Sequence, residues 1–317
     1  NAATVTTLTG LAADANIAYV ANISGTISGL ADEAVTISDT TLGADVLNTL
    51  NGYTTGVVNA SSVTILTGTY SDVNTSYSGN TASTISGLGN EAVTLNDLSI
   101  SATNLSSIDA LTSGIVTSSA TTLTGTYTEL NSVYTANTAG TVAGLGNEAI
   151  TASGSLTVDQ VNTLAGYTTG VLTATVSDND MSTLNGITES GHALTILVTD
   201  GSVAASNLNT LDSKTSAAVN AATVTTLTGL AADANTAYAS SGISGLGNEA
   251  VTISDTSLAS AVLNTLDGNT TGAVNAATVT TLTGLAADAN TAYASNGITG
   301  LGDEAVTLSD TSLAATV

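Results

Sequence analysis

The sequence of 317 residues contains no cysteine and no proline. Without cysteine no disulfide can hold the chain together, so its stability must come from repeated contacts or from bound ions. Proline lacks a backbone N–H donor. Its complete absence indicates a fold that uses nearly every backbone N–H, as a stacked ladder of strands does.

Positive charge is nearly absent as well: one Lys or Arg stands against 25 Asp and Glu, a formal net charge of −24. Binding to nucleic acid requires Lys and Arg to neutralise phosphates, so nucleic acid is not expected as a partner. No apolar run reaches the roughly 18 residues that a membrane-spanning helix needs, so no membrane insertion is expected. An acidic surface rich in Thr, Ser and Asn is typical of a protein secreted into salty water. We therefore expect an extracellular or cell-surface location.

The chain is built from repeats. The string NAATVTTLTGLAADANTAY occupies Asn220–Tyr238 and returns unchanged 55 residues later at Asn275–Tyr293. It also opens the chain at Asn1–Tyr19 with one change, Ile17. A second motif, GLxxEA[VI]T, marks the same phase of the repeat. We predict one continuous solenoid over 1–317, with units 1–58, 59–116, 117–172, 173–219 (degenerate), 220–274 and 275–317 (truncated).

Each unit combines short β-rich runs with helix-like runs. In one unit, Ala250–Ser254 is expected to be a strand, and Asp255 or Thr256 is expected to cap a helix over Ser257–Leu266. A second helical stripe is expected to start at Val279 and to be interrupted at Gly284. This alternation predicts an α/β repeat solenoid of short parallel strands and short helices, in units of about 55–58 residues. An all-β right-handed parallel helix is the alternative, because Thr and Val favour strands.

Two phrases carry a family resemblance: LNTLDGNTTGAVNAATVTTLTG and GLGDEAVTLSDTSLAATV. They resemble the giant cell-surface repeat proteins of marine cyanobacteria, a group that includes the type needed for flagellum-free swimming. The resemblance covers essentially the whole chain and is weakest over Thr173–Val219. It implies an extracellular location and a very long parent chain, and it brings no catalytic residue with it.

Carboxylates recur in register, because a Glu is followed six residues later by an Asp in several units. Stacking would place them in rows, and rows of carboxylates suit Ca²⁺, which takes six to eight oxygen ligands. The candidate calcium ligands are Asp32, Glu33, Asp39, Glu91, Asp97, Glu249, Asp255, Asp303, Glu304 and Asp310. The alternative is that each Asp caps a helix and each Glu lies in a solvated turn. Gly154 stands where the unit of Glu148 should have its Asp, which weakens the calcium hypothesis.

Other candidates point away from catalysis. His192 and Lys214 both fall in the degenerate unit. Neither lies among residues that could form a nucleophile–base pair, so they reflect sequence divergence of the repeat or a local contact. Tyr recurs at positions 19, 77, 134, 238 and 293 and is expected to pack at a helix end with its hydroxyl reaching water. We expect no enzyme, no catalytic residue and no cofactor apart from calcium.

These features together predict a structural protein that forms a surface filament, sheath or layer. Its expected partners are copies of itself or neighbouring repeats. The stalk of a cell-surface adhesin is the alternative function. Self-assembly of the repeat region would favour the filament, and a separate binding domain in the parent protein would favour the stalk.

Overall fold

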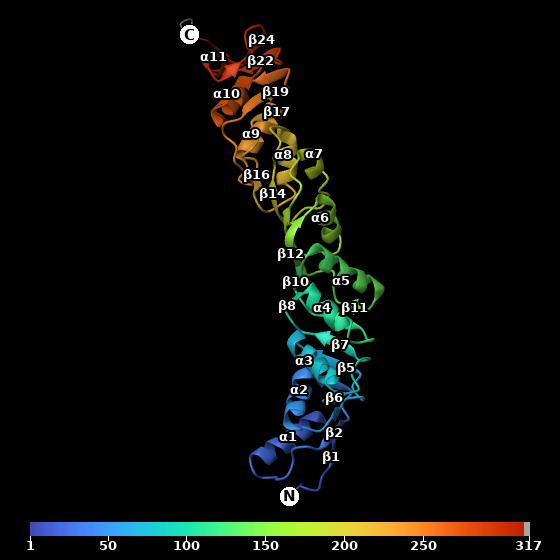
Figure 1. Cartoon of the computed structure of the whole chain (residues 1–317). Coiled ribbons are helices and arrows are strands. Elements are labelled where there is room, and N and C mark those ends of the chain that lie inside the picture. Colours follow the sequence, from blue (N-terminus) through green and yellow to red (C-terminus); the bar gives the residue numbers. More distant parts are fainter. Residues whose placement is uncertain (314–317) are drawn as a thin grey trace. The chain divides into compact units, whose positions relative to one another are not determined.

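The computed structural model describes residues 1–313 and shows an α/β chain in which short strands alternate with short helices (Figure 1). The strands described here pair in parallel. The α/β solenoid is therefore confirmed over the all-β alternative. The Ala- and Asn-rich runs form the helices, and the Thr-, Val- and Leu-rich runs form the strands.

The helices are α1 (Ala12–Ile23), α2 (Ala44–Tyr53), α3 (Tyr70–Thr81), α4 (Ala102–Asp109), α5 (Tyr127–Ala139), α6 (Val158–Ala165), α7 (Met181–Leu184), α8 (Ala205–Asp212), α9 (Ala231–Ala239), α10 (Ser260–Asn269) and α11 (Ala286–Ala294). The strands are β1 (Thr7–Gly10), β2 (Ala34–Ile37), β3 (Thr41–Gly43), β4 (Val58–Asn59), β5 (Ile65–Gly68), β6 (Ile85–Ser86), β7 (Ala92–Leu95), β8 (Ser99–Ser101), β9 (Val116–Ser118), β10 (Thr122–Gly125), β11 (Val142–Ala143), β12 (Ala149–Leu156), β13 (Leu172–Val176), β14 (Ala193–Leu197), β15 (Ser202–Ala204), β16 (Val219–Asn220), β17 (Thr226–Gly229), β18 (Ile243–Ser244), β19 (Ala250–Ile253), β20 (Ser257–Ala259), β21 (Val274–Asn275), β22 (Thr281–Gly284), β23 (Ile298–Thr299) and β24 (Ala305–Leu308).

The chain divides into two compact units. The first unit is Asn1–Ser153 with Tyr167–Val171, and the second is Gly154–Gly166 with Leu172–Val317. In the first unit the strands form the ladders β1-β2-β4-β6, β3-β5-β7-β9-β11 and β8-β10-β12. In the second unit they form the ladders β13-β14-β16-β18, β15-β17-β19-β21-β23 and β20-β22-β24.

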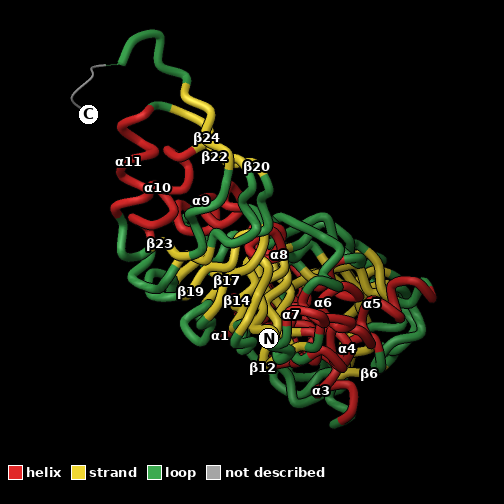
Figure 2. The backbone as a smooth tube through the Cα atoms, turned by 90° about the horizontal axis from the view of Figure 1, so that it is seen from above, coloured by secondary structure: helices red, strands yellow, loops and turns green. Residues whose placement is uncertain are grey.

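One coil of the solenoid is shorter than the sequence repeat. Hydrogen bonds between neighbouring coils join residues 24 or 27 positions apart. A 55-residue repeat therefore spans two coils, each with one helix. Successive helices pack side by side from α1 to α5 in the first unit and from α8 to α11 in the second, and Figure 2 shows α9, α10 and α11 together on one side of strands β17, β19 and β22.

The core lies between the strands and the helices of each coil. Side chains along a strand alternate, so in the central ladder of the first unit Leu42, Leu66, Val93, Val116 and Val142 point inward. Their exposure is 5% or less. Every second strand residue faces outward and is Thr, Ser, Asn or a small or aliphatic residue.

Two boundaries expected from the sequence are wrong. The segment expected to be a helix from Ser257 begins as strand β20, and α10 starts only at Ser260. Leu282, expected on a helical stripe, lies in strand β22, which pairs with β20. Ladder pairing with the neighbouring coil decides both cases, because a helical period in a short Thr-rich run is weaker than tertiary pairing. None of the helices in residues 1–313 has the length and apolar character that crossing a membrane requires.

Candidate functional site

The repeated Glu of the GLxxE motif is buried, not solvated. Glu33, Glu91, Glu148 and Glu249 are at most 1% exposed. The carboxylate folds back over its own turn: in Glu91 one oxygen accepts the N–H of Gly89 at 2.8 Å and that of Asn90 at 3.1 Å. The predicted solvated turn is therefore wrong for these four residues, because the carboxylate caps the turn from inside.

The repeated Tyr donates its hydroxyl hydrogen bond to this buried Glu. Tyr19 reaches Glu33 at 3.0 Å and Tyr238 reaches Glu249 at 3.0 Å. The further pairs are Tyr77 with Glu91, Tyr134 with Glu148 and Tyr293 with Glu304. The expectation that the Tyr hydroxyl reaches water is therefore wrong for Tyr19, Tyr77 and Tyr134, which are at most 3% exposed, whereas Tyr293 is 45% exposed. A constant offset between the two residues, 14 in the first unit and 11 in the second, is the sequence signal that links them.

A Thr and a Gly from the next coil complete the arrangement. The hydroxyl of Thr112 donates to the backbone carbonyl of Glu91 at 2.6 Å and accepts the N–H of Gly114 at 3.0 Å. Thr54, Thr168 and Thr270 make the same bond to Glu33, Glu148 and Glu249. A Cβ on Gly114 would collide with the carbonyl oxygen of Glu91, so only glycine allows this approach. We call this Tyr–Glu–Thr–Gly arrangement the latch.

The latch raises the pKa of its tyrosine hydroxyls. Burial, followed by the hydrogen bond and the charge of Glu91, raises the pKa of Tyr77, and the same causes raise the pKa of Tyr134. At Tyr293 the hydrogen bond to Glu304 comes first and raises the pKa to about 12. The buried carboxylate thus holds the phenol in its protonated, donating form.

Alkaline titration tests this environment. A phenol whose pKa is higher in the folded than in the unfolded state stabilises the fold below the unfolded pKa of about 10, and this stabilisation is lost as the pH rises towards the folded pKa. We expect the latch tyrosines of the native protein to ionise at higher pH than those of the urea-unfolded chain, with unfolding at the end of the titration. Near-ultraviolet difference absorbance measures this, and coincident native and unfolded titration curves would contradict it.

The repeated Asp caps a helix, but of the preceding coil. Asp255 was expected to cap the helix that follows it. Instead its Oδ2 accepts the N–H of Ala231, the first residue of α9, at 2.8 Å. The other pairs of this kind are Asp39 with Ala12, Asp97 with Tyr70, Asp178 with Val158, Asp200 with Met181 and Asp310 with Ala286. Helix capping is thus confirmed with a different helix as the target.

The exception at Gly154 concerns the start of α5. The helix that an Asp at this position would cap is α5, and α5 caps itself. Thr126 and Glu129 form a reciprocal capping box, in which Glu129 accepts the Thr126 N–H at 2.8 Å. That bond, with the hydroxyls of Thr103 and Thr126, lowers the pKa of Glu129. The capping box therefore supplies acceptors at the start of α5, but it does not by itself explain the missing Asp, because α6 has both a capping box and the cap from Asp178.

Removing one cap tests its contribution. Asp255→Ala leaves the first N–H group of α9, that of Ala231, without its acceptor and is expected to cost about 1 kcal/mol of unfolding free energy. Asp303→Ala removes the same charge from an exposed turn and should change stability by less than about 0.5 kcal/mol. Urea unfolding followed by circular dichroism compares the two variants. Equal losses would mean that charge, not capping, sets the effect.

Helices are also tied to each other by asparagine. The side-chain amide of Asn209 on α8 donates to the carbonyl of Asp233 on α9 at 2.9 Å, and Asn264 on α10 repeats this bond to Asp288 on α11 at 2.9 Å. In the first unit Asn48 makes the same bond to Asp72 at 2.8 Å. Strand pairs, latches, Asp caps and these amides thus all join one coil to the next.

In the degenerate segment, 173–219, the Tyr–Glu pair of the latch is absent and other contacts take its place. His192 occupies the place of the Glu, since GHALTI aligns with NEAVTI, and α7 before it is only four residues long and carries no Tyr. His192 is 6% exposed, and its Nδ1 accepts the Leu172 N–H at 3.1 Å. Burial lowers the pKa of His192, against the opposing charge of Glu189. Lys214 donates to the Thr188 carbonyl at 2.7 Å, so both residues bond to the backbone of the neighbouring coil.

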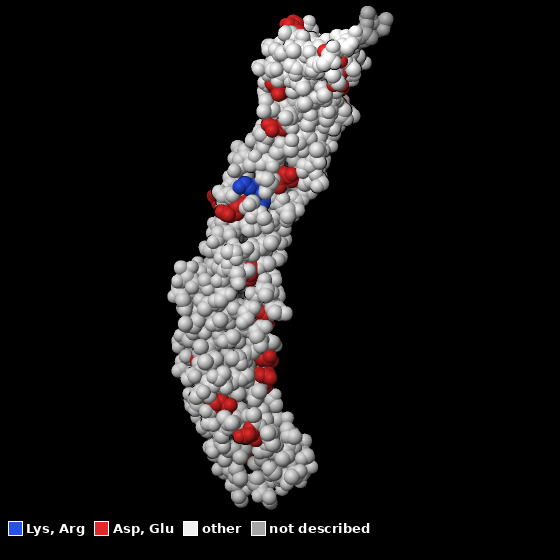
Figure 3. Space-filling view, turned by 180° about the vertical axis from the view of Figure 1, so that it is seen from behind, with Lys and Arg blue, Asp and Glu red and all other residues white. Residues whose placement is uncertain are grey.

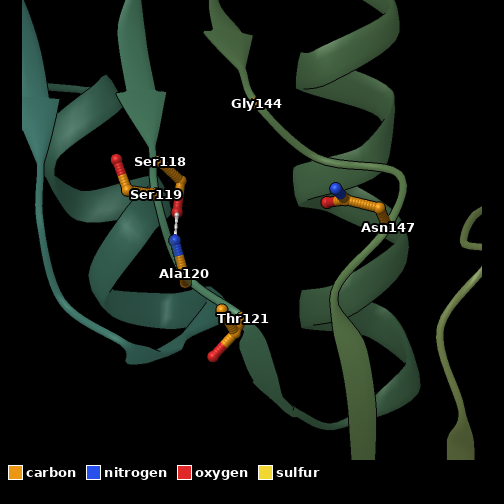
Figure 4. A pocket seen from close by; sticks show the side chains of 6 residues that line it. All are labelled: Ser118, Ser119, Ala120, Thr121, Gly144 and Asn147. Carbon is orange, nitrogen blue, oxygen red and sulfur yellow. Dashed lines mark hydrogen bonds between the residues drawn. The ribbon is translucent and has the colours of Figure 1, made fainter.

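One hollow marks a local irregularity (Figure 4). It measures about 260 Å³ and is lined by Ser118, Ser119, Ala120, Thr121, Gly144 and Asn147. The segment from Val116 to Leu123 is one residue shorter than its counterpart from Val58 to Leu66, and Ala120 lies where that counterpart buries Val63. The lining holds hydroxyls and an amide but no titratable side chain, so it offers no acid or base.

The carboxylates proposed for calcium are distributed over these separate roles. Glu33, Glu91 and Glu249 belong to buried latches, and Glu304 accepts the Tyr293 hydroxyl at a half-buried place. Asp39, Asp97, Asp255 and Asp310 cap helices, and Asp32 and Asp303 are exposed. Within residues 1–313 no three His, Cys, Asp or Glu side chains gather into a group that could hold a metal ion. On the face drawn in Figure 3 the acidic atoms form separate small groups, and the blue atoms belong to the single Lys or Arg, Lys214.

Calcium binding stays a prediction. Thermal unfolding in millimolar calcium and in chelator, at matched ionic strength, measures it. Extracellular sites with a Kd of about 10⁻⁴–10⁻³ M would fill under these conditions and raise the melting temperature. Coincident melting curves would leave the carboxylates with their structural roles alone.

Comparison with known proteins gave no match to a family model, to a curated protein or to a solved structure.

Proposed function

We propose that this chain is a structural, non-enzymatic part of an extracellular protein, and that its coils build a surface filament, sheath or layer. The observation that carries the proposal is the latch. In the latch the recurring Tyr and Thr donate hydrogen bonds to the recurring Glu, and the recurring Gly allows the next coil to approach it closely, in both units.

The chemistry of the other polar groups supports the same function. The Asp side chains that follow the GLxxE motif cap helices, and the Asn side chains of the LNTL helices bond to the next helix, so both already have structural partners. Solenoids of this kind gain stability mainly from contacts between neighbouring repeats, so length can be added without a new core. A structural protein needs this property, and an enzyme does not.

The composition supports an extracellular setting. A net charge of −24 with a single Lys or Arg is tolerated best at high ionic strength, where charges are screened within a few ångströms. The resemblance of the repeat phrases to giant cell-surface proteins of marine cyanobacteria points in the same direction.

Location is the direct test. Antibodies against this chain, with gold labels, should decorate the outside of intact cells of the producing organism, and electron microscopy should show the label on a continuous filament or layer. Label confined to permeabilised cells would contradict the proposal. Label restricted to the base of thin projections that end in another domain would favour the adhesin stalk.

A further inference from the structure

The outward sheet faces carry no charge, although the chain has a net charge of −24. None of the strands β1 to β24 contains an Asp, Glu, Lys, Arg or His. The acidic residues lie in the helices and in the connecting turns instead. Each unit therefore combines charged helix and turn surfaces with uncharged sheet surfaces.

One of these sheet faces is also partly apolar. The ladder β3-β5-β7-β9-β11 of the first unit places Thr41, Ile65, Ala92 and Ile115 in one outward row. Ile65 is 39% exposed and Ile115 is 50% exposed. A second outward row runs beside it through Thr67, Thr94 and Thr117. We call these two rows the Ile–Thr face.

The second unit offers an internal comparison. Its ladder β15-β17-β19-β21-β23 has the same arrangement, with Thr226 and Ala273 in the places of Ile65 and Ile115. Thr252 on β19 corresponds to Thr94 on β7. At these two positions the aliphatic side chains occur in the ladder of the first unit and not in that of the second, so the ladder does not require them.

We infer that the Ile–Thr face docks against the same face of a second copy of this chain. The inference deepens the proposed structural function, on which it rests, by naming the surface through which copies join. The charge distribution of the chain indicates that the partner of this face is a second copy. Two molecules that each carry −24 repel wherever carboxylates meet, and burying an unpaired carboxylate is costly. Face-to-face contact of two uncharged sheets buries apolar side chains and no carboxylate.

Symmetry supports the same partner. In a two-fold dimer a patch meets its own copy, so it must be self-complementary. The Ile–Thr face meets this condition, because its rows of Thr and Ile repeat at the strand spacing of about 4.8 Å on each of the two copies. Five strands span only about 20–25 Å, so the buried area falls below the roughly 800 Å² per partner of a stable interface. We therefore expect a weak, concentration-dependent association that strengthens with salt, as screening reduces the repulsion.

Sedimentation equilibrium of the chain at low and high salt tests the inference. The weight-average mass should rise with concentration, and more steeply at high salt. The double variant Ile65→Asp/Ile115→Asp should weaken association at least tenfold, whereas Thr226→Asp/Ala273→Asp adds the same charge to the second unit and should leave it unchanged. Unchanged melting of both variants confirms that they fold. A monomer under all conditions, or equal effects of the two variants, would overturn the inference.

The absence of cysteine allows a second, independent measurement. Thr94 lies on the central strand of the Ile–Thr face, so in a two-fold dimer the two Thr94 side chains approach each other. Thr94→Cys should be joined into dimers by a short bifunctional thiol cross-linker, and Thr252→Cys should not. Equal cross-linking of the two would place the contact elsewhere. Absence of surface label on cells would remove the proposed function but leave this association intact.

Discussion

Replacing Gly272 with alanine is expected to destabilise the protein by about 3 kcal/mol or more. The Cβ of the new side chain would collide with the carbonyl oxygen of Glu249, a backbone atom that cannot rotate away. The coils must therefore separate locally, which breaks the Thr270 bond to the same carbonyl at 2.6 Å and the Gly272 bond to Thr270 at 3.0 Å. Overpacking alone costs about 1–3 kcal/mol, and lost buried hydrogen bonds add to it.

Gly268→Ala is the matched control, four residues earlier in the same repeat. Gly268 lies near the end of α10, and a Cβ there meets no atom within 4 Å. Alanine in a helix is better than glycine by about 0.5–1 kcal/mol, so this variant should be slightly stabilised. The same chemical change thus has opposite expected signs, and urea unfolding measures both. If Gly272→Ala unfolds at the wild-type midpoint, the latch does not hold the coils together.

The repeat length and the α/β class could be predicted from the sequence, because both depend on patterns that recur in register. The two-coil content of each repeat could not. Its two halves are unlike in sequence: one carries the Tyr helix and the other the LNTL helix, so self-comparison finds only the full period. Pairing between coils, which makes the halves equivalent, becomes visible only in the ladders.

The candidate residues were found from the sequence, but their partners were not. Tyr77 and Glu91 each belong to a repeat that the sequence analysis names, and their constant spacing of 14 residues is the only signal that connects them. Thr112, 21 residues beyond Glu91, was not singled out from the sequence. The Asp caps failed for a related reason. Local rules assign an Asp to the helix that follows it, whereas in a solenoid the helix one coil earlier is closer in space. Ala217, in the degenerate segment, stands where the latch has its glycine, which shows that the glycine requirement belongs to the Glu-bearing coils.

The second large effect is expected at Tyr77. Tyr77→Phe removes one hydroxyl and leaves the buried carboxylate of Glu91 with its two backbone donors only. Tyr77 is 3% exposed and Glu91 is 1% exposed, so water cannot replace the missing donor without opening the coil. Loss of a hydrogen bond to a buried charged group costs about 1.5–3 kcal/mol, and we expect a loss in unfolding free energy of that size.

Tyr293→Phe removes the same kind of bond, to Glu304, at a place where Tyr293 is 45% exposed. Water can solvate that carboxylate, so the loss should be much smaller. A double-mutant cycle with Glu91→Gln separates the Tyr77–Glu91 coupling from other effects of the substitutions. Hydrogen exchange of the amides in β7 and β9 then locates the loss, because weakening of one latch should first open the two coils that it joins. Equal destabilisation by Tyr77→Phe and Tyr293→Phe, or a coupling of zero, would show that the buried Tyr–Glu pair adds packing but no specific bond to the stack.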